Sequence, residues 1–494
     1  MRREIRFLRR GREVRLADFS PTLTLLDYLR LHERATGTKE GCAEGDCGAC
    51  TVVVRRHTKN GPIYQPQNSC IMLAGQCDGA EIITVEDLVD GKTGKLHPVQ
   101  HAMVEQHGSQ CGFCTPGFVM ALFALYHARH SRPLDRAQVT DSIAGNLCRC
   151  TGYRPIVDAA LASCNGKPGD QFAGEEEKIN EALSNLDDRL DVFIGTDKRF
   201  FASPVSVHAL AQLYVQHPDA VLLGGATDVG LWITKQLRDL PKIIWVGRVQ
   251  GLDEIDAGAS AITFGAAVTH QAALPHLASI DPDLGELMRR FAGLQVRSIG
   301  TIGGNIANGS PIGDLPPALI ALGATLTLQR GAMTRTVPLE KFFIAYGKQD
   351  RTPGEFVRAV RVPRLERNEK FRCYKISKRF EQDISAVMGA FKFTLDGTRI
   401  RAARIAFGGM AGTPKRADAT ERALQGADLN QPSSWDPAVA ALTKDFAPID
   451  DQRASAGYRT GIAQALLCKA LMEIAGAPSA LTRVTGQREA AHAG

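Results

Sequence analysis

The sequence predicts a multidomain α+β protein. With 494 residues, the chain is long enough for about three domains. The first 90 residues indicate short strands, whereas helical periodicity dominates residues 97–160. From about residue 200, short apolar strands are mixed with helices. The composition, 44% hydrophobic and 23% charged, is typical of globular proteins.

Residues 1–90 predict a small β-rich domain. Apolar residues alternate on either side of Gly11, which indicates a β-hairpin rather than a targeting peptide, although the start is rich in arginine. We expect a short helix at 24–31, then a cysteine-rich loop and a strand at 51–55, and residues 81–88 close the domain.

Residues 91–165 predict a small helical domain. Three stretches show helical periodicity: 98–107, 115–129 and 136–147. We expect Thr115 to be the N-cap of the second stretch and Pro116 to lie in its first turn.

The remainder predicts a linker, two α+β domains and a tail. We expect a surface linker at 166–200, whose acidic run Glu175–Glu177 is solvated, followed by domains at 201–367 and 368–480. The tail, 481–494, is expected to be disordered from 487 onward. Strands are expected at 220–223, 243–246, 261–265 and 400–407, and a late helix at 460–474.

Eight of the twelve cysteines form two groups. The first has the spacing C-x4-C-x2-C…C of plant-type ferredoxins, and the second has the spacing C-x2-C…C-x-C. The groups are Cys42, Cys47, Cys50 and Cys70, and Cys111, Cys114, Cys148 and Cys150. Three glycines lie among residues 41–50, so that a tight loop can wrap a cluster. We therefore expect two [2Fe–2S] clusters, the first in a β-grasp ferredoxin domain and the second in a four-helix-type domain.

Other readings of these cysteines remain open. Four thiolates also suit structural zinc, although zinc ribbons favour paired C-x2-C motifs, and disulfides are rare in chains without a signal peptide. The other four cysteines are expected to be buried apolar thiols: Cys77, Cys164, Cys373 and Cys468.

Charge and hydropathy restrict the possible partners. The net charge of +6 is spread without a long basic block, which gives nucleic-acid binding little support. The sequence contains no run of 18 apolar residues, so no membrane span is predicted. We expect a cytoplasmic protein.

Two glycine-rich loops, 222–229 and 301–314, indicate a flavin site. Glycines beside Thr, Asn and Ser let backbone amides approach a diphosphate, yet neither loop is a G-x-G-x-x-G or Walker A motif. A flavin is also what the chemistry requires, because the clusters carry one electron at a time and a hydride transfer needs a two-electron carrier.

The motifs resemble those of the molybdenum hydroxylase family, in particular the small subunit of bacterial xanthine dehydrogenases. Residues 38–51 resemble the first-cluster loop of that family, and residues 110–117 and 146–153 resemble its second-cluster motifs. Residues 201–365 resemble its FAD domain, and residues from 375 onward resemble its last flavoprotein domain. The first glycine-rich loop, 222–229, differs from that of animal relatives at Ala226 and Asp228, where those relatives carry Asn and Glu.

The resemblance implies specific contacts. Gln110 would face the molybdopterin of a partner subunit, or would only cap a helix end. Arg379 and Asp383 would lie near the flavin ring and tune the access of NAD or oxygen, or would form a surface ion pair. Lys375 would bind FAD, or would simply be solvated. FAD contacts are implied for Leu222, Leu223, Gly224, Gly225, Ala226, Thr227, Asp228, Val229, Phe291, Ala292, Thr301, Gly304, Asn305, Asn308, Asp314, Phe356, Val357 and Lys375.

The resemblance also implies a function. The chain would be the electron-transfer subunit of an NAD-dependent xanthine dehydrogenase, in a heterotetramer with a molybdopterin-binding large subunit. Electrons from hypoxanthine or xanthine would pass through the second cluster, the first cluster and FAD to NAD+. We expect the molybdenum cofactor on a second polypeptide, because no residues remain for it after about residue 480. The alternatives are a molybdenum hydroxylase acting on an aldehyde, CO or an N-heterocycle, and a zinc-stabilised scaffold without redox chemistry.

Overall fold

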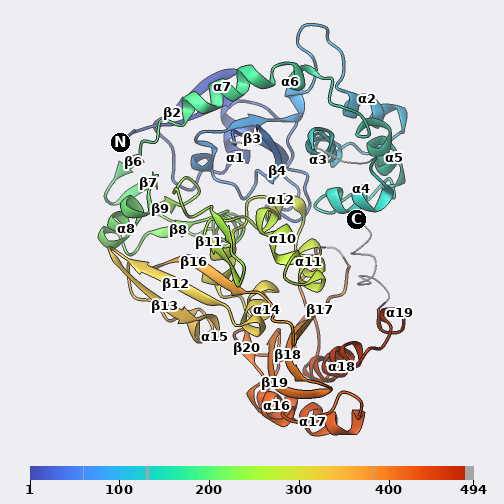
Figure 1. Ribbon diagram of the computed structural model, residues 1–494. Coiled ribbons are helices and arrows are strands. Elements are labelled where there is room, and N and C mark those ends of the chain that lie inside the picture. Colours follow the sequence, from blue (N-terminus) through green and yellow to red (C-terminus); the bar gives the residue numbers. More distant parts are fainter. Residues whose placement is uncertain (59–60, 129–132, 381, 484–494) are drawn as a thin grey trace. The chain divides into compact units, whose positions relative to one another are not determined.

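The computed structural model describes residues 1–58, 61–128, 133–380 and 382–483, and these form two compact units (Figure 1). Unit 1 contains Met1–Gln250 and Ala292–Gly300, and unit 2 contains Gly251–Phe291 and the described residues from Thr301 onward. The FAD-binding domain predicted at 201–367 therefore contributes residues to both units. The tail predicted to be disordered, 487–494, lies outside the described residues.

Unit 1 begins with a five-stranded sheet of order β2-β1-β5-β3-β4. The predicted hairpin is confirmed, and β5 runs parallel to β1 and antiparallel to β3. Its strands are β1 (Ile5–Arg9), β2 (Arg12–Leu16), β3 (Thr51–Arg56), β4 (Ile63–Asn68) and β5 (Glu81–Ile83). The short helix α1 (Leu25–Asp27) and the turn Tyr28–His32 bury Leu25 and Leu29 against this sheet, which gives the expected β-grasp core.

Four helices follow in a bundle. They are α2 (Pro98–Glu105), α3 (Thr115–His127), α4 (Arg136–Ile143) and α5 (Arg154–Ser163). Helix α3 is apolar along most of its length and is buried by the other three and by β3. The sequence did not predict α5. The predicted N-cap was one residue off: Cys114 occupies that position and Thr115 is the first helical residue, while Pro116 lies in the first turn as expected.

The segment predicted to be a surface linker, 166–200, contains regular secondary structure. It contains α6 (Gln171–Gly174), α7 (Glu176–Leu186) and β6 (Val192–Thr196). Ile179, Leu183 and Leu186 recur on one face of α7 and pack against Leu8 of β1. The acidic run lies at the start of this amphipathic helix, where negative side chains favour the helix dipole.

A four-stranded sheet of order β6-β7-β9-β8 completes unit 1. Both β7 and β8 run parallel to β9, and the first glycine-rich loop follows β8. The remaining elements are β7 (Arg199–Ser203), α8 (Val207–Gln216), β8 (Val221–Leu223), α9 (Val229–Thr234), β9 (Lys242–Trp245) and α12 (Leu294–Arg297).

Unit 2 contains an antiparallel sheet of order β10-β11-β16-β12-β13 and a second one of order β17-β18-β19-β20. The strands are β10 (Ile255–Ala257), β11 (Ala261–Gly265), β12 (Thr325–Arg330), β13 (Met333–Pro338), β16 (Phe356–Pro363), β17 (Glu369–Ile376), β18 (Val387–Asp396), β19 (Arg399–Gly408) and β20 (Lys415–Arg416). A small hairpin adds β14 (Phe343–Ala345) and β15 (Lys348–Gln349).

Helices cover both sheets of unit 2. They are α10 (His270–Ala278), α11 (Pro282–Arg289), α13 (Ile302–Asn308), α14 (Leu315–Leu322), α15 (Leu339–Phe342), α16 (Asp418–Ala423), α17 (Asp436–Asp445), α18 (Ala456–Ile474) and α19 (Ser479–Thr482). The apolar α14 is buried on all sides, because it shares one core with strands of both sheets. Among the described residues, no helix combines the length and the apolar character that crossing a membrane requires.

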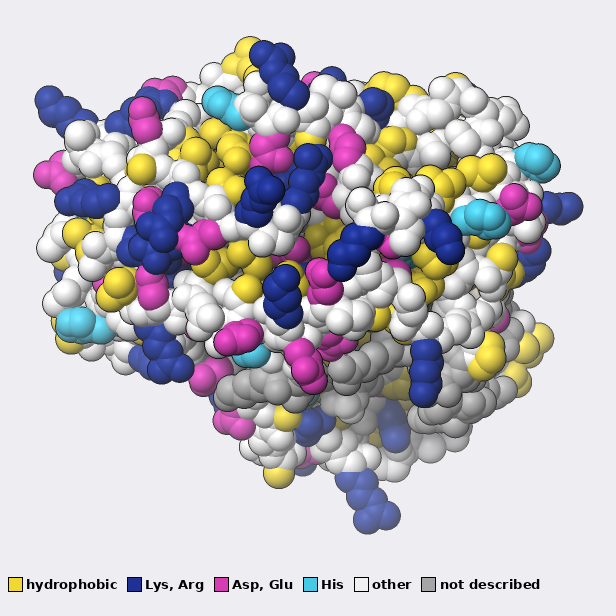
Figure 2. Space-filling model, turned by 90° about the horizontal axis from the view of Figure 1, so that it is seen from above, with side chains coloured by type: hydrophobic (Ala, Val, Ile, Leu, Met, Phe, Trp, Pro, Cys, Tyr) yellow, Lys and Arg dark blue, Asp and Glu magenta, His cyan; other side chains and the backbone are white. Residues whose placement is uncertain are grey.

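The exposed charges are mixed. On the face shown in Figure 2, Lys and Arg side chains are interspersed with Asp and Glu side chains, and no broad patch of one sign covers the residues described there.

Candidate functional site

The first cysteine group converges in unit 1. The Sγ atoms of Cys50 and Cys70 are 3.3 Å apart, and the thiols of Cys47 and Cys70 lie within hydrogen-bonding reach of Cys42. The N–H of Cys47 donates to the Cys42 sulfur at 3.4 Å. Three free thiols of the loop 42–50 meet that of Cys70, which follows β4, and four such thiols without a histidine or carboxylate in the predicted set fit a [2Fe–2S] cluster.

The second group converges at helix ends of the bundle. The Cys114 thiol lies against Cys148, and that of Cys111 lies against Cys150. The Thr151 hydroxyl and N–H point to the Cys148 sulfur, at 3.2 and 3.5 Å. These free thiols also fit a cluster, and two of them, Cys111 and Cys150, are exposed. Gln110, next to Cys111, is exposed as well and lies in the loop between α2 and α3.

The two cysteine loops are in direct contact. The N–H of Leu147, which precedes Cys148, donates to the carbonyl of Cys47 at 3.0 Å. Gly48 has a φ of +70°, and a Cβ there would collide with the carbonyl oxygen of Gly145. Glycine at position 48 thus permits the backbones of the two loops to touch.

Helix α9, which follows the first glycine-rich loop, packs against the first cysteine loop within unit 1. The Thr234 hydroxyl of α9 donates to the carbonyl of Ala43 at 2.6 Å. A Cβ on Gly230 would lie 2.7 Å from Ile71, the neighbour of Cys70. Gly225 approaches the backbone of Ile299 so closely that a Cβ would collide with its carbonyl oxygen. The loop and the helix that follows it are therefore held by close contacts at Gly225 and Gly230 that leave no room for a Cβ.

The second glycine-rich loop, 301–314, lies in unit 2 and consists of the short helix α13 and the turn that follows it. Thr301 is the N-cap, and its Oγ1 accepts from the N–H of Gly304 at 3.0 Å. Asn308 is exposed, whereas Asn305 Oδ1 is buried without a hydrogen-bond partner. An unpaired buried acceptor is costly, and it fits a loop that awaits a polar ligand such as FAD.

Other residues with implied FAD contacts lie in the core of unit 2. Phe356 and Val357 are buried in β16, and Phe291 packs on the His270 ring at 4.7 Å. The ammonium of Lys375 is not solvated, because it pairs with Asp314 at 2.5 Å with both side chains buried.

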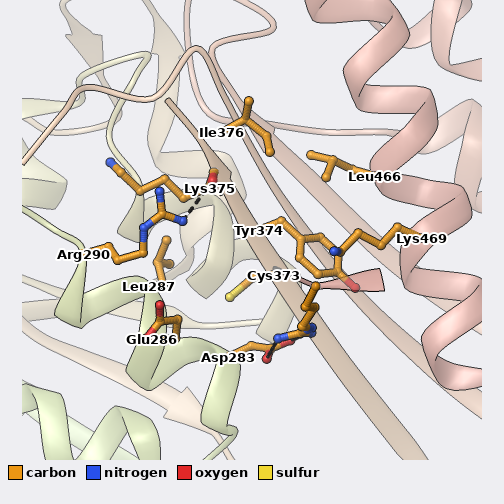
Figure 3. Close-up of a pocket in the computed structure, with 11 residues that line it drawn as sticks. Asp283, Glu286, Leu287, Arg290, Cys373, Tyr374, Lys375, Ile376, Leu466 and Lys469 are labelled. Carbon is orange, nitrogen blue, oxygen red and sulfur yellow. Dashed lines mark hydrogen bonds and ion pairs between the residues drawn. The ribbon is translucent and has the colours of Figure 1, made fainter. Parts of the chain in front are cut away.

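A cavity of about 220 Å³ lies beside Lys375 (Figure 3). It is bounded by α11, β17 and α18, and Arg290 extends from the end of α11 to the carbonyl of Lys375 at 3.2 Å. Ser385, which the sequence analysis missed, donates to the other oxygen of Asp314 at 2.5 Å. No local motif indicates Ser385, because it lies 71 residues from Asp314.

Arg379 and Asp383 form an ion pair of 3.8 Å in a surface loop. Burial opposes ionisation of Asp383, but hydrogen bonds from the Arg379 N–H and the nearby guanidinium lower its pKa below the usual range. Asp383 is thus ionised at neutral pH. Of the four remaining cysteines, Cys77, Cys164 and Cys373 are buried and Cys468 is half-buried.

Four family models match the chain in succession. They describe a 2Fe-2S iron-sulfur cluster binding domain at residues 10–74, a [2Fe-2S] binding domain at 84–161, an FAD binding domain in molybdopterin dehydrogenase at 196–365 and a CO dehydrogenase flavoprotein C-terminal domain at 372–474. The chain therefore contains two [2Fe–2S]-binding domains and an FAD-binding domain.

The similar proteins agree with these matches. Xanthine dehydrogenase of Emericella nidulans is 33% identical over 90% of this chain, and xanthine dehydrogenase/oxidase of Gallus gallus is 31% identical over 87%. The chain spans only 36% and 37% of these relatives. Among solved structures, a chain of Cu,Mo-CO dehydrogenase has a TM-score of 0.53 at 27% identity, and one of quinoline 2-oxidoreductase from Pseudomonas putida 86 has 0.51 at 26%. Each match covers 56% of this chain, and 97% and 96% of the other chain.

Proposed function

This chain carries the iron–sulfur and flavin domains of the molybdenum hydroxylase family, and from that premise we propose that it is the electron-transfer subunit of a xanthine dehydrogenase. When bound, the two clusters would each carry one electron at a time, and FAD would collect two electrons. The eight grouped cysteines would hold the clusters, and the loops 222–229 and 301–314 would contribute to FAD binding.

One observation carries this proposal. In unit 1 the second cysteine loop touches the first through Leu147 and Cys47, and the first touches α9, the helix that follows the first glycine-rich loop, through Ala43 and Thr234. These two contacts join the three segments in an unbroken series, with two exposed cysteines, Cys111 and Cys150, at one end. That exposed end suits docking of a molybdopterin-binding partner, and the flavin end suits NAD+ as the final acceptor.

The electron order can be tested with a Cys148→Ser variant of the complex with its large subunit. We expect the variant to retain FAD but to lose flavin reduction by xanthine, because the cluster next to the partner is broken. Flavin reduction at the wild-type rate would contradict the order. Parallel assays with NAD+ and O2 identify the acceptor.

A second candidate is the equivalent subunit of another molybdenum hydroxylase. The structural similarity to chains of CO dehydrogenase and quinoline 2-oxidoreductase favours it, because those matches cover nearly all of the matched chains. The xanthine dehydrogenases match through 90% and 87% of this chain, clusters and flavin domain together, which is why we prefer xanthine. The same complex, assayed with an aldehyde, CO and an N-heterocycle, separates these substrates.

Measuring the iron, sulfide and zinc content distinguishes this proposal from the alternative of a zinc-stabilised scaffold without redox chemistry. We expect about four iron and four labile sulfide per chain in anaerobically purified protein, since two [2Fe–2S] clusters require them. The protein should be red-brown. A colourless protein with zinc in place of iron would instead identify a zinc-stabilised scaffold.

A further inference from the structure

Two buried amide side chains lie at the junction of the two cysteine loops in unit 1. Asn146 directly precedes Leu147 in the second loop, and Gln295 belongs to α12, far away in the sequence. They are 2% and 1% exposed. A buried amide is costly unless it is hydrogen-bonded, so its partners indicate what it holds in place.

The hydrogen bonds of both amides converge on one turn of the first loop. Asn146 Nδ2 donates to the carbonyl of Gly48 at 3.0 Å, and Gln295 Nε2 donates to Asn146 Oδ1 at 2.8 Å and to Thr51 Oγ1 at 3.2 Å. The Thr51 hydroxyl in turn donates to the same Gly48 carbonyl at 2.6 Å. Gly48 lies between Cys47 and Cys50, and Asn146 lies two residues before Cys148.

The surrounding glycines make this junction intolerant of displacement. A Cβ on Gly145 would collide with the Gln295 side chain, and a Cβ on Gly117 would collide with the Gly48 carbonyl. Hydrogen bonds are directional, whereas apolar contacts alone would let the two loops slide. The separation of the two sets of thiols therefore depends on the hydrogen bonds of Asn146 and Gln295 together with the backbone bond from Leu147 to Cys47.

We propose that Asn146 and Gln295 are positioning residues that set the distance between the two clusters and thereby the rate at which an electron passes between them. This inference rests on the proposed function, because it requires both clusters. Neither residue ligates iron; each acts through the loops that carry the ligands. Electron-transfer rates fall steeply with distance, so a small shift of one loop is expected to have a large effect.

The test uses the purified chain with its clusters and FAD, without the partner subunit. Asn146→Asp removes the donor to Gly48, and Gln295→Glu removes the donors to Asn146 and Thr51. Gly145→Ala keeps both amides but displaces the Gln295 side chain. The matched control is Asn165→Asp, because Asn165 also bridges two segments of the helical domain, Leu134 and Leu161, but lies away from the junction.

We expect all three variants to keep their iron and to change the magnetic interaction between the two reduced clusters in low-temperature EPR spectra. Rapid-freeze EPR after addition of one electron equivalent should show slower inter-cluster transfer than in the wild type. The control should match the wild type.

Two results would overturn the inference. Wild-type coupling and wild-type transfer in the three variants would show that the junction does not set the distance. Loss of iron from either cluster would show that the two amides stabilise the clusters rather than position them. A wild-type chain without two clusters would instead refute the proposed function itself.

Discussion

The proposed cluster ligands differ in the number of donors that reach their sulfur atoms. Cys148 receives both the hydroxyl and the N–H of Thr151, and its own N–H donates to the Tyr153 hydroxyl at 2.9 Å. Hydrogen bonds to a ligand sulfur stabilise the more negative, reduced form of a cluster and so raise its reduction potential. Thr151 is therefore expected to tune the second cluster.

Thr151→Val should lower the reduction potential of the second cluster and leave that of the first unchanged. Valine keeps the branched shape of threonine but removes the hydroxyl donor, while the backbone N–H remains. The measurement is an EPR-monitored redox titration of the purified chain. Thr140→Val is the control, since the Thr140 hydroxyl only donates to the carbonyl of Arg136. An unchanged or higher potential in Thr151→Val would contradict this role.

At this scale, local spacing predicts ligands but not the residues that position them. Both cysteine groups were evident from the sequence because most of their members form short motifs, at 42–50, 111–114 and 148–150. The hydrogen bond between Gln295 and Asn146 joins residues 149 positions apart, and that between Ser385 and Asp314 joins residues 71 apart. No periodicity or motif contains such a pairing, because it arises only when the chain has folded.

At the scale of elements, long periodic segments were predicted and irregular ones were missed. The helices α2, α3 and α18 and the strands β3 and β19 lie close to their predicted ranges. Strand β4 was missed because its sequence, IYQPQN, does not alternate and contains a proline; as an edge strand it tolerates Pro66. Helix α7 was missed because its acidic start resembles a solvated linker.

A group of three buried side chains holds the start of the predicted linker. Asp170 caps α6, and its Oδ2 accepts from His97 Nε2 at 2.7 Å and from His127 Nε2 at 2.9 Å. Two histidines and a carboxylate could also hold a metal ion. However, His97 Nδ1 accepts from the N–H of Val99, so its Nε2 carries the proton and donates instead of binding a metal. The group therefore connects α2 and α3 to α6 by hydrogen bonds.

Asp170→Asn should destabilise unit 1 by about 2 kcal/mol, the usual worth of hydrogen bonds to a buried charge. The asparagine amide would also oppose the Nε2 donors. Thermal melting followed by circular dichroism measures the loss, and proteolysis near residue 170 should become faster. Asp197→Asn, in an exposed turn, is the control. Equal melting temperatures of Asp170→Asn and the wild type would show that this hydrogen-bonded group does not stabilise unit 1.

The same group predicts a pH dependence. Burial opposes ionisation of Asp170, but hydrogen bonds from His127 and His97 outweigh it and hold its pKa below the usual value of 3.8. A lowered pKa contributes stability above the pKa of the unfolded chain and loses it as the pH falls further. The difference in melting temperature between wild type and Asp170→Asn should persist from pH 8 to pH 5 and shrink below about pH 4. Acid loss of the clusters affects both proteins and cancels in the difference.

At the scale of the whole molecule, the predicted domains do not coincide with the two compact units. Residues 201–250 pack with unit 1 because β7, β8 and β9 form one sheet with β6, whereas residues 251–291 pack with unit 2. The sequence shows strands and glycine-rich loops but not which strands share a sheet. Both cysteine groups lie in unit 1, and the second glycine-rich loop lies in unit 2.

This separation predicts that FAD binding can be lost while both iron–sulfur clusters are retained. Expressed without a partner, the chain should bind FAD, pass electrons from NADH to an artificial dye and show no xanthine oxidation. Gly304→Val should abolish FAD binding and the dye reaction, because its Cβ would lie 2.8 Å from Thr301 Oγ1 in the loop where the backbone is expected to approach the cofactor. Its iron content should stay at about four per chain, since both clusters lie in unit 1.

The matched control for Gly304→Val is Gly461→Val. Both glycines are exposed and helical, but a Cβ at Gly461 meets no atom within 4 Å, and valine is no worse than glycine as a helix former, so this variant should fold as the wild type does. We expect it to bind FAD and to reduce the dye as the wild type does. Flavin absorbance, iron content and dye reduction are measured on each protein. Normal FAD content in Gly304→Val, or xanthine oxidation by the isolated chain, would contradict the prediction. Parallel loss of iron and FAD in Gly304→Val would show that the two units do not fold independently.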